Sequence, residues 1–461
     1  MAIGWILAAM MIMILRFGNF QNIVMSFCLL EWSSHLILVL FTASYPFDVA
    51  TEQTFLNDEI KHLSENFEKI ILVPRRCNGI KLPVPHNVEV VEDYFSFLES
   101  AGKFSIALSV LTSTLFYRDL LAHPWLLFNI PSLGRLFAFL GGAYLTRQWL
   151  ENLIGKNQMD VRQCIFYTYW FDQGAMGIGL AKRFFPDLKL VSRAHGYDLY
   201  EERYSPPYWP CRPFSFEALD ALFADSDAGL KYLNERYPAY STRFEAAFLG
   251  VGDPGFITEP SSDGVFRVVS CSIIRPVKRV ELLSEGLVHA ARQRPGQKIE
   301  WHHFGNGEFE GVRENLQKYA NETLPANARA FFPGYTTQQG LMEYYRSNPV
   351  DVFFNVSISE GTPVSSMEAI SCGIPLVATG VGGNCEIVTN QNGLLLSPNP
   401  SSEEIADAIY RFIDVPGWAI EKRRGSRALW REKYDANQNF RAFIRRLKAI
   451  RGAGEPYDRD R

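Results

Sequence analysis

Two glutamates in residues 355–379, NVSISEGTPVSSMEAISCGIPLVAT, have the spacing of a ligand site. Glu360 follows an apolar strand, and Glu368 lies on the second turn of the helix that we expect next, with Thr362 as its N-cap and Pro363 as its first residue. Free N–H groups at the start of a helix suit a diphosphate. A carboxylate one turn later is placed to accept both hydroxyls of a ribose 2′,3′-diol.

Three more side chains follow predicted strands and are candidates for the same chemistry. Lys278, in IIRPVKRV, follows a buried strand of the second half of the chain. His195, in SRAHGYDLY, comes directly after a strand of the first half of the chain and opens a polar loop. Asp198 is close enough in sequence either to orient His195 or to meet an acceptor.

The chain offers little for a metal ion. Asp225-Ser226-Asp227 has the form of a DxD motif, but it stands between a strand and a helix, so we interpret it as a helix N-cap. Seven cysteines are scattered without a CxxC or Cys/His cluster. We therefore predict no metal requirement, no disulfide framework and a reducing cytoplasm.

The elements that position these residues alternate between strands and helices in two series. The first begins with a strand from His35, and the second with a strand from Phe266. In the first amphipathic helix the apolar positions recur every three to four residues, at Leu56, Ile60, Leu63 and Phe67. The pattern predicts an α/β fold of two Rossmann-like domains with parallel sheets.

The length and the composition divide the chain into four parts. Because 461 residues suit two domains, we place the junction in the stretch rich in Gly, Pro, Ser and Asp between 252 and 264. The predicted parts are an apolar N-terminal extension or membrane anchor (1–33), an acceptor domain (34–252), a donor domain (253–430) and a C-terminal helix with a tail (431–461).

Two apolar segments leave alternatives open. The run MAIGWILAAMMIMIL at the start is a shallow membrane anchor, a short spanning helix, or an extension upstream of a start at Met25. Residues 103–155 are nearly continuous apolar sequence with a net charge of +2 between 101 and 155. They form either helices on an anionic membrane face or ordinary core helices.

The segment SEGTPVSSMEAISCGIPLVATGVGGNCEIV resembles the signature of glycosyltransferase family 4. The shared pattern is the pair of glutamates with seven residues between them, then Gly373, Pro375 and Val377, then Gly382-Gly383 and Glu386. FGNGE, PGYTTQQGLMEYY and NGLLL match in order as well. The resemblance is strong over 266–412 and moderate in the first half. It implies a retaining GT-B glycosyltransferase, whose two domains face each other across a cleft.

The resemblance also implies roles for particular residues. Glu368 would hold the donor ribose, Glu360 the donor sugar, and Lys278 the diphosphate. His195 would face the donor sugar and the acceptor, with Asp198 beside it. We expect catalytic roles for His195, Glu360 and Lys278. The expected donor-binding set is Arg275, Lys278, Gly334, Tyr335, Gly361, Thr362, Pro363, Val364 and Glu368.

Two departures from the family pattern concern the phosphates. The family usually has an arginine five residues before the lysine, where this chain has Ile273, and we expect Arg275 to substitute for it. Many members have a Gly-Gly loop after the first strand. The corresponding ASYPFDVATEQTF contains no glycine.

The expected function is transfer of a sugar from a nucleotide-diphosphate sugar, without a cofactor, to an acceptor hydroxyl. The aromatic, arginine-containing segment 103–155 favours a polyprenyl-diphosphate-linked saccharide as acceptor, in exopolysaccharide, capsule or lipopolysaccharide O-antigen synthesis. The protein would lie in the cytoplasm on the inner face of the plasma membrane. The net charge of −4 argues against nucleic acid. A sugar-nucleotide epimerase and a noncatalytic partner in a membrane polysaccharide assembly are the alternatives.

Overall fold

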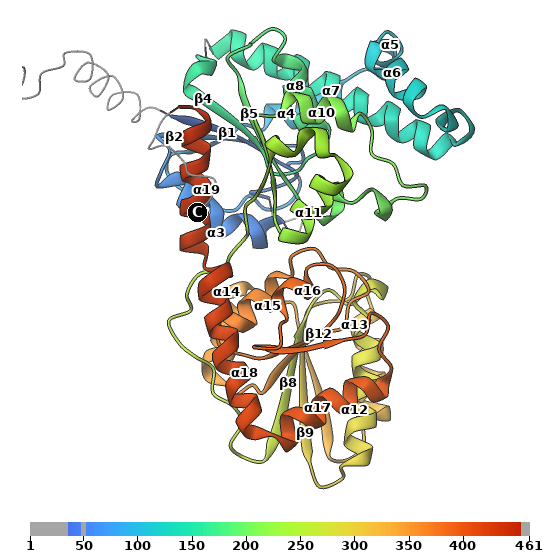
Figure 1. Ribbon diagram of the computed structural model, residues 1–461, viewed down its shortest axis with the longest axis vertical. Helices are drawn as coiled ribbons and strands as arrows, with labels where there is room; N and C mark the ends of the chain where they lie inside the picture. The colour runs from blue at the N-terminus through green and yellow to red at the C-terminus, as the bar shows by residue number, and fades with distance from the viewer. Residues whose placement is uncertain (1–35, 48–51, 158, 453–461) are drawn as a thin grey trace, which may run out of the picture.

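The computed structural model describes residues 36–47, 52–157 and 159–452, and these form two lobes, each built on a parallel sheet (Figure 1). The predicted segment 1–33 lies outside the described residues. The α/β architecture of two Rossmann-like domains predicted from the sequence is confirmed.

The first sheet has seven strands in the order β3-β2-β1-β4-β5-β6-β7. Alternate residues of its strands are buried in clusters on its two faces, which accounts for their near-continuous apolar sequences. The strands are β1 (Ile37–Thr42), β2 (Lys69–Pro74), β3 (Val88–Val90), β4 (Cys164–Thr168), β5 (Lys189–Ala194), β6 (Ala221–Ala224) and β7 (Phe244–Ala246).

Helices cover both faces of this sheet. The α-helices are α3 (Glu52–Ser64), α4 (Asp93–Ser100), α5 (Lys103–Leu111), α6 (Thr114–Ala122), α7 (Ile130–Asn157), α8 (Gln173–Ala181), α9 (Gly196–Leu199), α10 (Arg212–Ala218) and α11 (Asp227–Arg236). The 3₁₀ helices are η1 (Pro124–Phe128), η2 (Val161–Gln163), η3 (Glu201–Arg203) and η4 (Pro238–Arg243). The amphipathic helix predicted after the first strand is confirmed as α3, with Leu56, Ile60 and Leu63 buried.

The second sheet has six parallel strands in the order β10-β9-β8-β11-β12-β13. They are β8 (Val265–Cys271), β9 (Lys298–Phe304), β10 (Ala328–Gly334), β11 (Val352–Asn355), β12 (Leu376–Thr379) and β13 (Gly393–Leu396). Around them lie η5 (Pro276–Lys278), α12 (Val280–Gln293), α13 (Val312–Thr323), α14 (Gln338–Ser347), α15 (Val364–Ser371), α16 (Asn384–Ile387), α17 (Ser402–Asp414) and α18 (Pro416–Leu429). The strand order reverses between β8 and β11, where doubly wound sheets bind ligands.

The chain returns to the first lobe at its end. After α18, the π-helical turn η6 (Trp430–Tyr434) leads into α19 (Ala436–Ile450), which lies beside α3 in Figure 1. Phe443, Ile444 and Leu447 of α19 are buried in the core of the first sheet. The two lobes therefore share the C-terminal segment.

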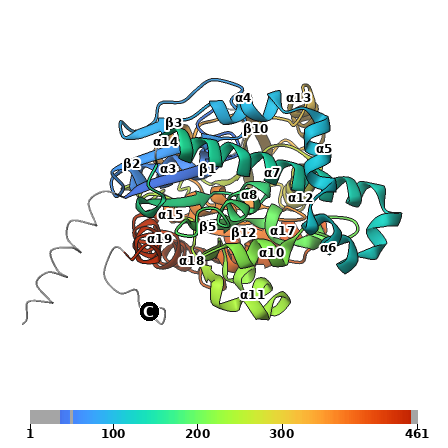
Figure 2. The ribbon, with the colours of Figure 1, turned by 90° about the horizontal axis from the view of Figure 1, so that it is seen from above.

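Helices α5 and α6 project from the side of the first lobe, away from its sheet (Figures 1 and 2). Helices α5 and α6 pack on α7, and we call the exposed large aliphatic and phenylalanine side chains of α5, α6, η1 and the first residue of α7 the apolar ridge. The ridge consists of Phe104, Leu108, Leu111, Leu121, Leu127, Phe128 and Ile130. No single helix of the described chain is long and apolar enough to cross a membrane, although α5 and α6, bent by 62°, meet the length and composition criteria as a pair.

Candidate active site

Lys278 and Glu360 meet at the switch point of the second sheet. Lys278 lies in η5, after β8, and Glu360 lies in the loop after the neighbouring strand β11. Lys278 Nζ donates to Glu360 Oε1 at 2.6 Å, with the two side chains 18% and 9% exposed. The sheet therefore joins two charged groups that are 82 residues apart in sequence.

Glu360 is held by more than this ion pair. Ser357 Oγ donates to the same oxygen at 2.6 Å, and Asn355 Nδ2 donates to it at 3.1 Å. Arg279, which sequence reasoning missed, fixes the strand end by donating to the carbonyls of Val356 and Ser357. Three donors on one oxygen give the carboxylate a defined orientation before any substrate arrives.

The helix after this loop begins one residue later than predicted. Pro363 is the N-cap of α15 and makes no side-chain capping bond, and Val364 is its first residue. The hydroxyl of Thr362, the expected cap, instead donates at 3.4 Å to the carbonyl of Asp225 in the first domain. The predicted end of the helix is confirmed, because Gly373 follows the C-cap Cys372 with φ +72°.

Glu368 lies on the buried side of α15 and is 4% exposed. Burial raises the pKa of this carboxyl to about 8, an effect that a hydrogen bond from Gln338 opposes. Its Oε1 has no hydrogen-bond partner among the described residues. A buried acceptor without a partner is destabilising, and a hydroxyl group of a ligand would satisfy it.

Gly382 and Gly383 let the backbone pass directly beneath the Glu360 loop. A Cβ at Gly383 would lie 1.9 Å from the carbonyl oxygen of Gly361, and one at Gly382 would lie 2.0 Å from that of Glu360. No side chain fits at these distances. The two glycines therefore couple the loop to α16, which starts at the next residue.

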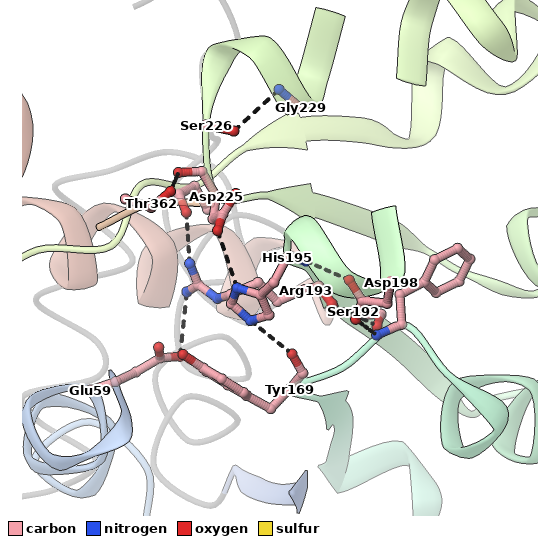
Figure 3. Close-up of polar contacts among 12 residues, drawn as sticks. Glu59, Tyr169, Ser192, Arg193, His195, Asp198, Asp225, Ser226, Gly229 and Thr362 are labelled. Atoms are coloured by element: carbon pink, nitrogen blue, oxygen red, sulfur yellow. Dashed lines mark hydrogen bonds and ion pairs between the residues drawn. The ribbon is translucent and has the colours of Figure 1, made fainter. Parts of the chain in front are cut away.

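His195 faces this loop from the first domain. Its ring packs at a tilt against the rings of Tyr169 and Trp170. Nδ1 lies 3.3 Å from Asp225 Oδ2, and Nε2 lies 3.1 Å from the carbonyl oxygen of Tyr169 (Figure 3). The next residue, Gly196, approaches the second domain: a Cβ on Gly361 would lie 3.8 Å from its backbone nitrogen. The structure thus brings His195 and the Glu360 loop to one interdomain boundary.

The Asp198 carboxylate binds the backbone of His195 rather than its ring. The side chain is fully buried, and its oxygens accept from the backbone N–H groups of His195 at 2.6 Å and Phe171 at 2.7 Å. Burial raises its pKa to about 6. Both oxygens are engaged inside the domain, and contact between Asp198 and an acceptor stays a prediction.

Arg275 lies outside β8, since the strand ends at Cys271. Ile273 and Arg275 are both exposed, and Ile274 between them is buried. Within the described part of the chain, the Arg275 side chain makes no hydrogen bond or ion pair, so it is available to an anion. Its role as a phosphate ligand stays a prediction.

Gly334 and Tyr335 lie at the C-terminal end of β10, two strands from β8. Gly334 has φ +86°, and the Tyr335 N–H donates to Asn306 Oδ1 at 3.0 Å. The Tyr335 side chain is 69% exposed. The pair is on the same edge of the sheet as Lys278 and Glu360, as a donor-binding role requires.

The backbone of the loop after β1 binds the carboxylate of Glu52, the first residue of α3, a contact that sequence reasoning did not predict. The carboxylate of Glu52 accepts from the backbone N–H groups of Ala43 at 2.8 Å, Ser44 at 2.7 Å and Tyr45 at 2.9 Å. Trp170 Nε1 also donates to it, at 2.7 Å. These amides are therefore not available to a phosphate in this structure.

The DxD motif is structural, as predicted. Ser226 is the N-cap of α11 and accepts from the Gly229 N–H at 3.2 Å (Figure 3). Asp225 is the partner of His195, a contact that the motif did not signal. Across residues 36–47, 52–157 and 159–452, no three His, Cys, Asp or Glu side chains are grouped to hold a metal ion. Metal independence stays a prediction.

Comparison with known proteins finds a family match in the second domain. Residues 259–428 match the family model described as glycosyl transferases group 1. The chain is 34% identical to the D-inositol 3-phosphate glycosyltransferase of Mycobacteroides abscessus over 138 residues, which are 30% of this chain and 29% of that relative. The chain thus spans less than a third of that curated relative.

Solved structures share the whole architecture. The sucrose-phosphate synthase of Thermosynechococcus elongatus superposes with a TM-score of 0.62 over 91% of this chain and 100% of that one, at 15% identity. Anabaena HepE in complex with UDP and glucose superposes with a TM-score of 0.59 over 90% and 100%, also at 15% identity. At such identities the likeness shows the fold alone.

Proposed function

We propose that this protein, whose residues 259–428 match the model of the group 1 glycosyl transferases, is a retaining glycosyltransferase using a nucleotide-diphosphate sugar. The observation that carries the proposal is the convergence of the Lys278–Glu360 pair and the buried, incompletely bonded Glu368 at one switch point. A donor needs a cation for its phosphates and an acceptor for its ribose, and this edge of the sheet offers both.

Each group has a defined part in the transfer. Lys278 exchanges its bond to Glu360 for the diphosphate and stabilises the charge that develops as the sugar–phosphate bond breaks. The backbone of Gly361–Val364 faces the phosphates, and Glu368 accepts from the ribose hydroxyls. Glu360 and His195 contact the sugar from opposite domains. We assign retention by front-face attack: the acceptor oxygen bonds to the anomeric carbon from the side on which the sugar–phosphate bond breaks, and the departing phosphate takes the proton of the acceptor hydroxyl.

We propose a polyprenyl-diphosphate-linked saccharide as the acceptor and the inner face of the plasma membrane as the location. The apolar ridge supports this assignment, because seven large apolar side chains exposed on one projection suit a lipid interface. Lys103 and Arg118 are the exposed charged side chains of α5 and α6, and both are cationic. Asp119, the acidic residue of α6, is buried.

A donor screen tests the function directly. UDP-, GDP-, ADP- and dTDP-sugars are incubated with the protein, and nucleoside diphosphate release is measured with a polyprenyl-diphosphate saccharide, with inositol 3-phosphate, or without acceptor. We expect release to depend on the lipid-linked acceptor, to persist in EDTA, and to give a product of retained configuration. Transfer to inositol 3-phosphate, the acceptor for which a relative is named, would replace the lipid-linked proposal.

The same screen distinguishes the alternative functions. An epimerase of this fold would convert the donor into a second sugar nucleotide without any acceptor, and it has no need of the apolar ridge. A noncatalytic partner in a polysaccharide assembly would transfer nothing by itself. In the complete assembly, undiminished transfer with the Glu360→Gln variant would favour that noncatalytic role.

A further inference from the structure

Glu386 of the second domain binds the start of a helix in the first domain. Its Oε1 accepts from the Ala228 N–H at 2.7 Å, and its Oε2 accepts from the Asp227 N–H at 3.1 Å. Asp227 and Ala228 are the first two residues of α11, whose N–H groups have no partner within the helix. A carboxylate at this position is further stabilised by the helix dipole.

Lys433 completes the contact from the segment that connects α18 to α19. Its Nζ lies 2.7 Å from Asp227 Oδ2 and 3.4 Å from Glu386 Oε2. One cation thus bridges carboxylates of both domains and offsets their mutual repulsion. The Glu386 side chain is 14% exposed, so its carboxylate is mostly shielded from water, whereas the Asp227 side chain is 62% exposed.

Both sides of this contact lead directly to the candidate active site. On the second domain, Glu386 belongs to α16, which follows the two glycines packed beneath the Glu360 loop. On the first domain, α11 follows Asp225, whose carboxylate contacts His195 and whose carbonyl accepts from Thr362. The contact therefore joins the two short segments that carry the two halves of the site.

We propose that Glu386 is a positioning residue that fixes the register between the two domains, and so places the donor loop Gly361–Thr362 against His195. The inference rests on the proposed transferase function. The groups assigned to the phosphates and the ribose, Lys278 and Glu368, both lie in the second domain. Loss of the contact should therefore lower kcat while leaving the affinity for the donor nearly unchanged.

Three variants test this assignment. Glu386→Ala removes both bonds to α11, Glu386→Gln keeps one acceptor oxygen, and Glu421→Gln is the control, an exposed glutamate on α18 of the same domain. For Glu386→Ala we expect kcat to fall about tenfold or more while the KM for the donor sugar changes less than about threefold. Glu386→Gln should recover part of kcat, and the control should match wild type.

A second measurement does not depend on activity. Small-angle X-ray scattering of the full chain should give a larger radius of gyration for Glu386→Ala than for wild type or Glu421→Gln, because the domains separate more often. An unchanged scattering profile together with an unchanged kcat would overturn the proposal. So would a loss of donor affinity in proportion to kcat, since Glu386 would then act on the donor itself. If wild type transfers no sugar, the transferase proposal fails, and scattering alone decides the role of Glu386.

Discussion

The buried carboxylate of Glu368 lowers the stability of the folded protein when it is ionised, and it leaves one oxygen free for a ligand hydroxyl. Its pKa of about 8 in the folded protein, against 4.5 for an ordinary glutamate, means that ionisation is disfavoured by folding. The associated loss of stability is absent below about pH 4.5 and grows as the pH rises toward 8. A carboxylate kept for a ligand in this way is consistent with a binding role.

We therefore predict that Glu368→Gln stabilises the empty protein more at pH 8 than at pH 5. At pH 8 the melting temperature of the variant should exceed that of wild type by about 2–4 °C for each kcal/mol of ionisation cost that the substitution removes. At pH 5 the two melting temperatures should be nearly equal. Calorimetry at the two pH values gives the comparison. Nucleoside diphosphate affinity should fall in the same variant, and a variant that is destabilised at pH 8 would contradict this account.

We assign phosphate binding to two cations, Lys278 and Arg275, which differ in burial and in protein partners. Lys278 is partly buried and paired with Glu360, whereas Arg275 is exposed and without a protein partner in the described chain. We predict that Lys278→Ala lowers kcat by roughly 10²–10³-fold, the effect of removing one preorganised group at a developing charge.

Arg275→Ala should also lower turnover, by roughly tenfold, if this arginine stands in for the one absent at Ile273. Steady-state kinetics with the donor found in the screen measures both effects. Turnover that survives Arg275→Ala and is abolished by Lys278→Ala would remove Arg275 from the phosphate site. Arg292, an exposed arginine on α12, serves as the control position.

At the scale of elements, segment 103–155 has two parts. Helix α7 packs on α8 and the sheet as a core helix, whereas the apolar ridge is exposed. Contact of the ridge with a membrane stays a prediction. Apolar content by itself does not separate these cases. Which side of a helix meets a neighbour depends on the path of the chain.

We predict that Leu121→Glu with Phe128→Glu reduces binding to vesicles that contain anionic lipid. These side chains are 80% and 90% exposed, so the change should leave the fold and the melting temperature nearly unchanged. Flotation of the protein with vesicles measures the effect, and high salt should weaken wild-type binding because Lys103 and Arg118 contribute. Phe184→Glu, at another exposed position, is the control. Equal flotation of all three proteins would exclude the ridge as the lipid contact.

At the scale of the whole molecule, the two domains are connected by the chain crossing near Val251, by the return of α19, and by the contact of Glu386 with α11. Leu447 of α19 is fully buried in the core of the first sheet, although it belongs to the C-terminal segment. The stability of the first domain therefore depends on residues that follow the second domain in the sequence.

We predict that Leu447→Ala lowers the free energy of unfolding by about 2–5 kcal/mol, the usual cost of such a cavity. Hydrogen exchange should accelerate in β1 and β4 of the first sheet and much less in β8 and β11 of the second. Lys448→Ala, next to it on the partly exposed side of α19, is the control. Equal acceleration in both sheets would mean that the two domains unfold as one unit.

The sequence by itself determined the two parallel sheets, the ligand loop after Asn355, and the candidates Lys278, Glu360, Glu368 and His195. These follow from local rules, since strand periodicity, capping residues and the position of a residue after a strand are all set within a few neighbours. The DxD motif was correctly interpreted as a cap for the same reason.

The tertiary structure alone decided which distant groups become partners. The N–H groups that Glu52 and Glu386 occupy, the bond from Thr362 to Asp225, the burial of Asp198 and the exposure of the apolar ridge all depend on how separate segments pack. Thr362 does not cap α15 because its hydroxyl donates to the other domain, and both Asp198 oxygens bind backbone N–H groups inside their own domain. Such contacts join residues far apart in sequence, and no local pattern encodes them.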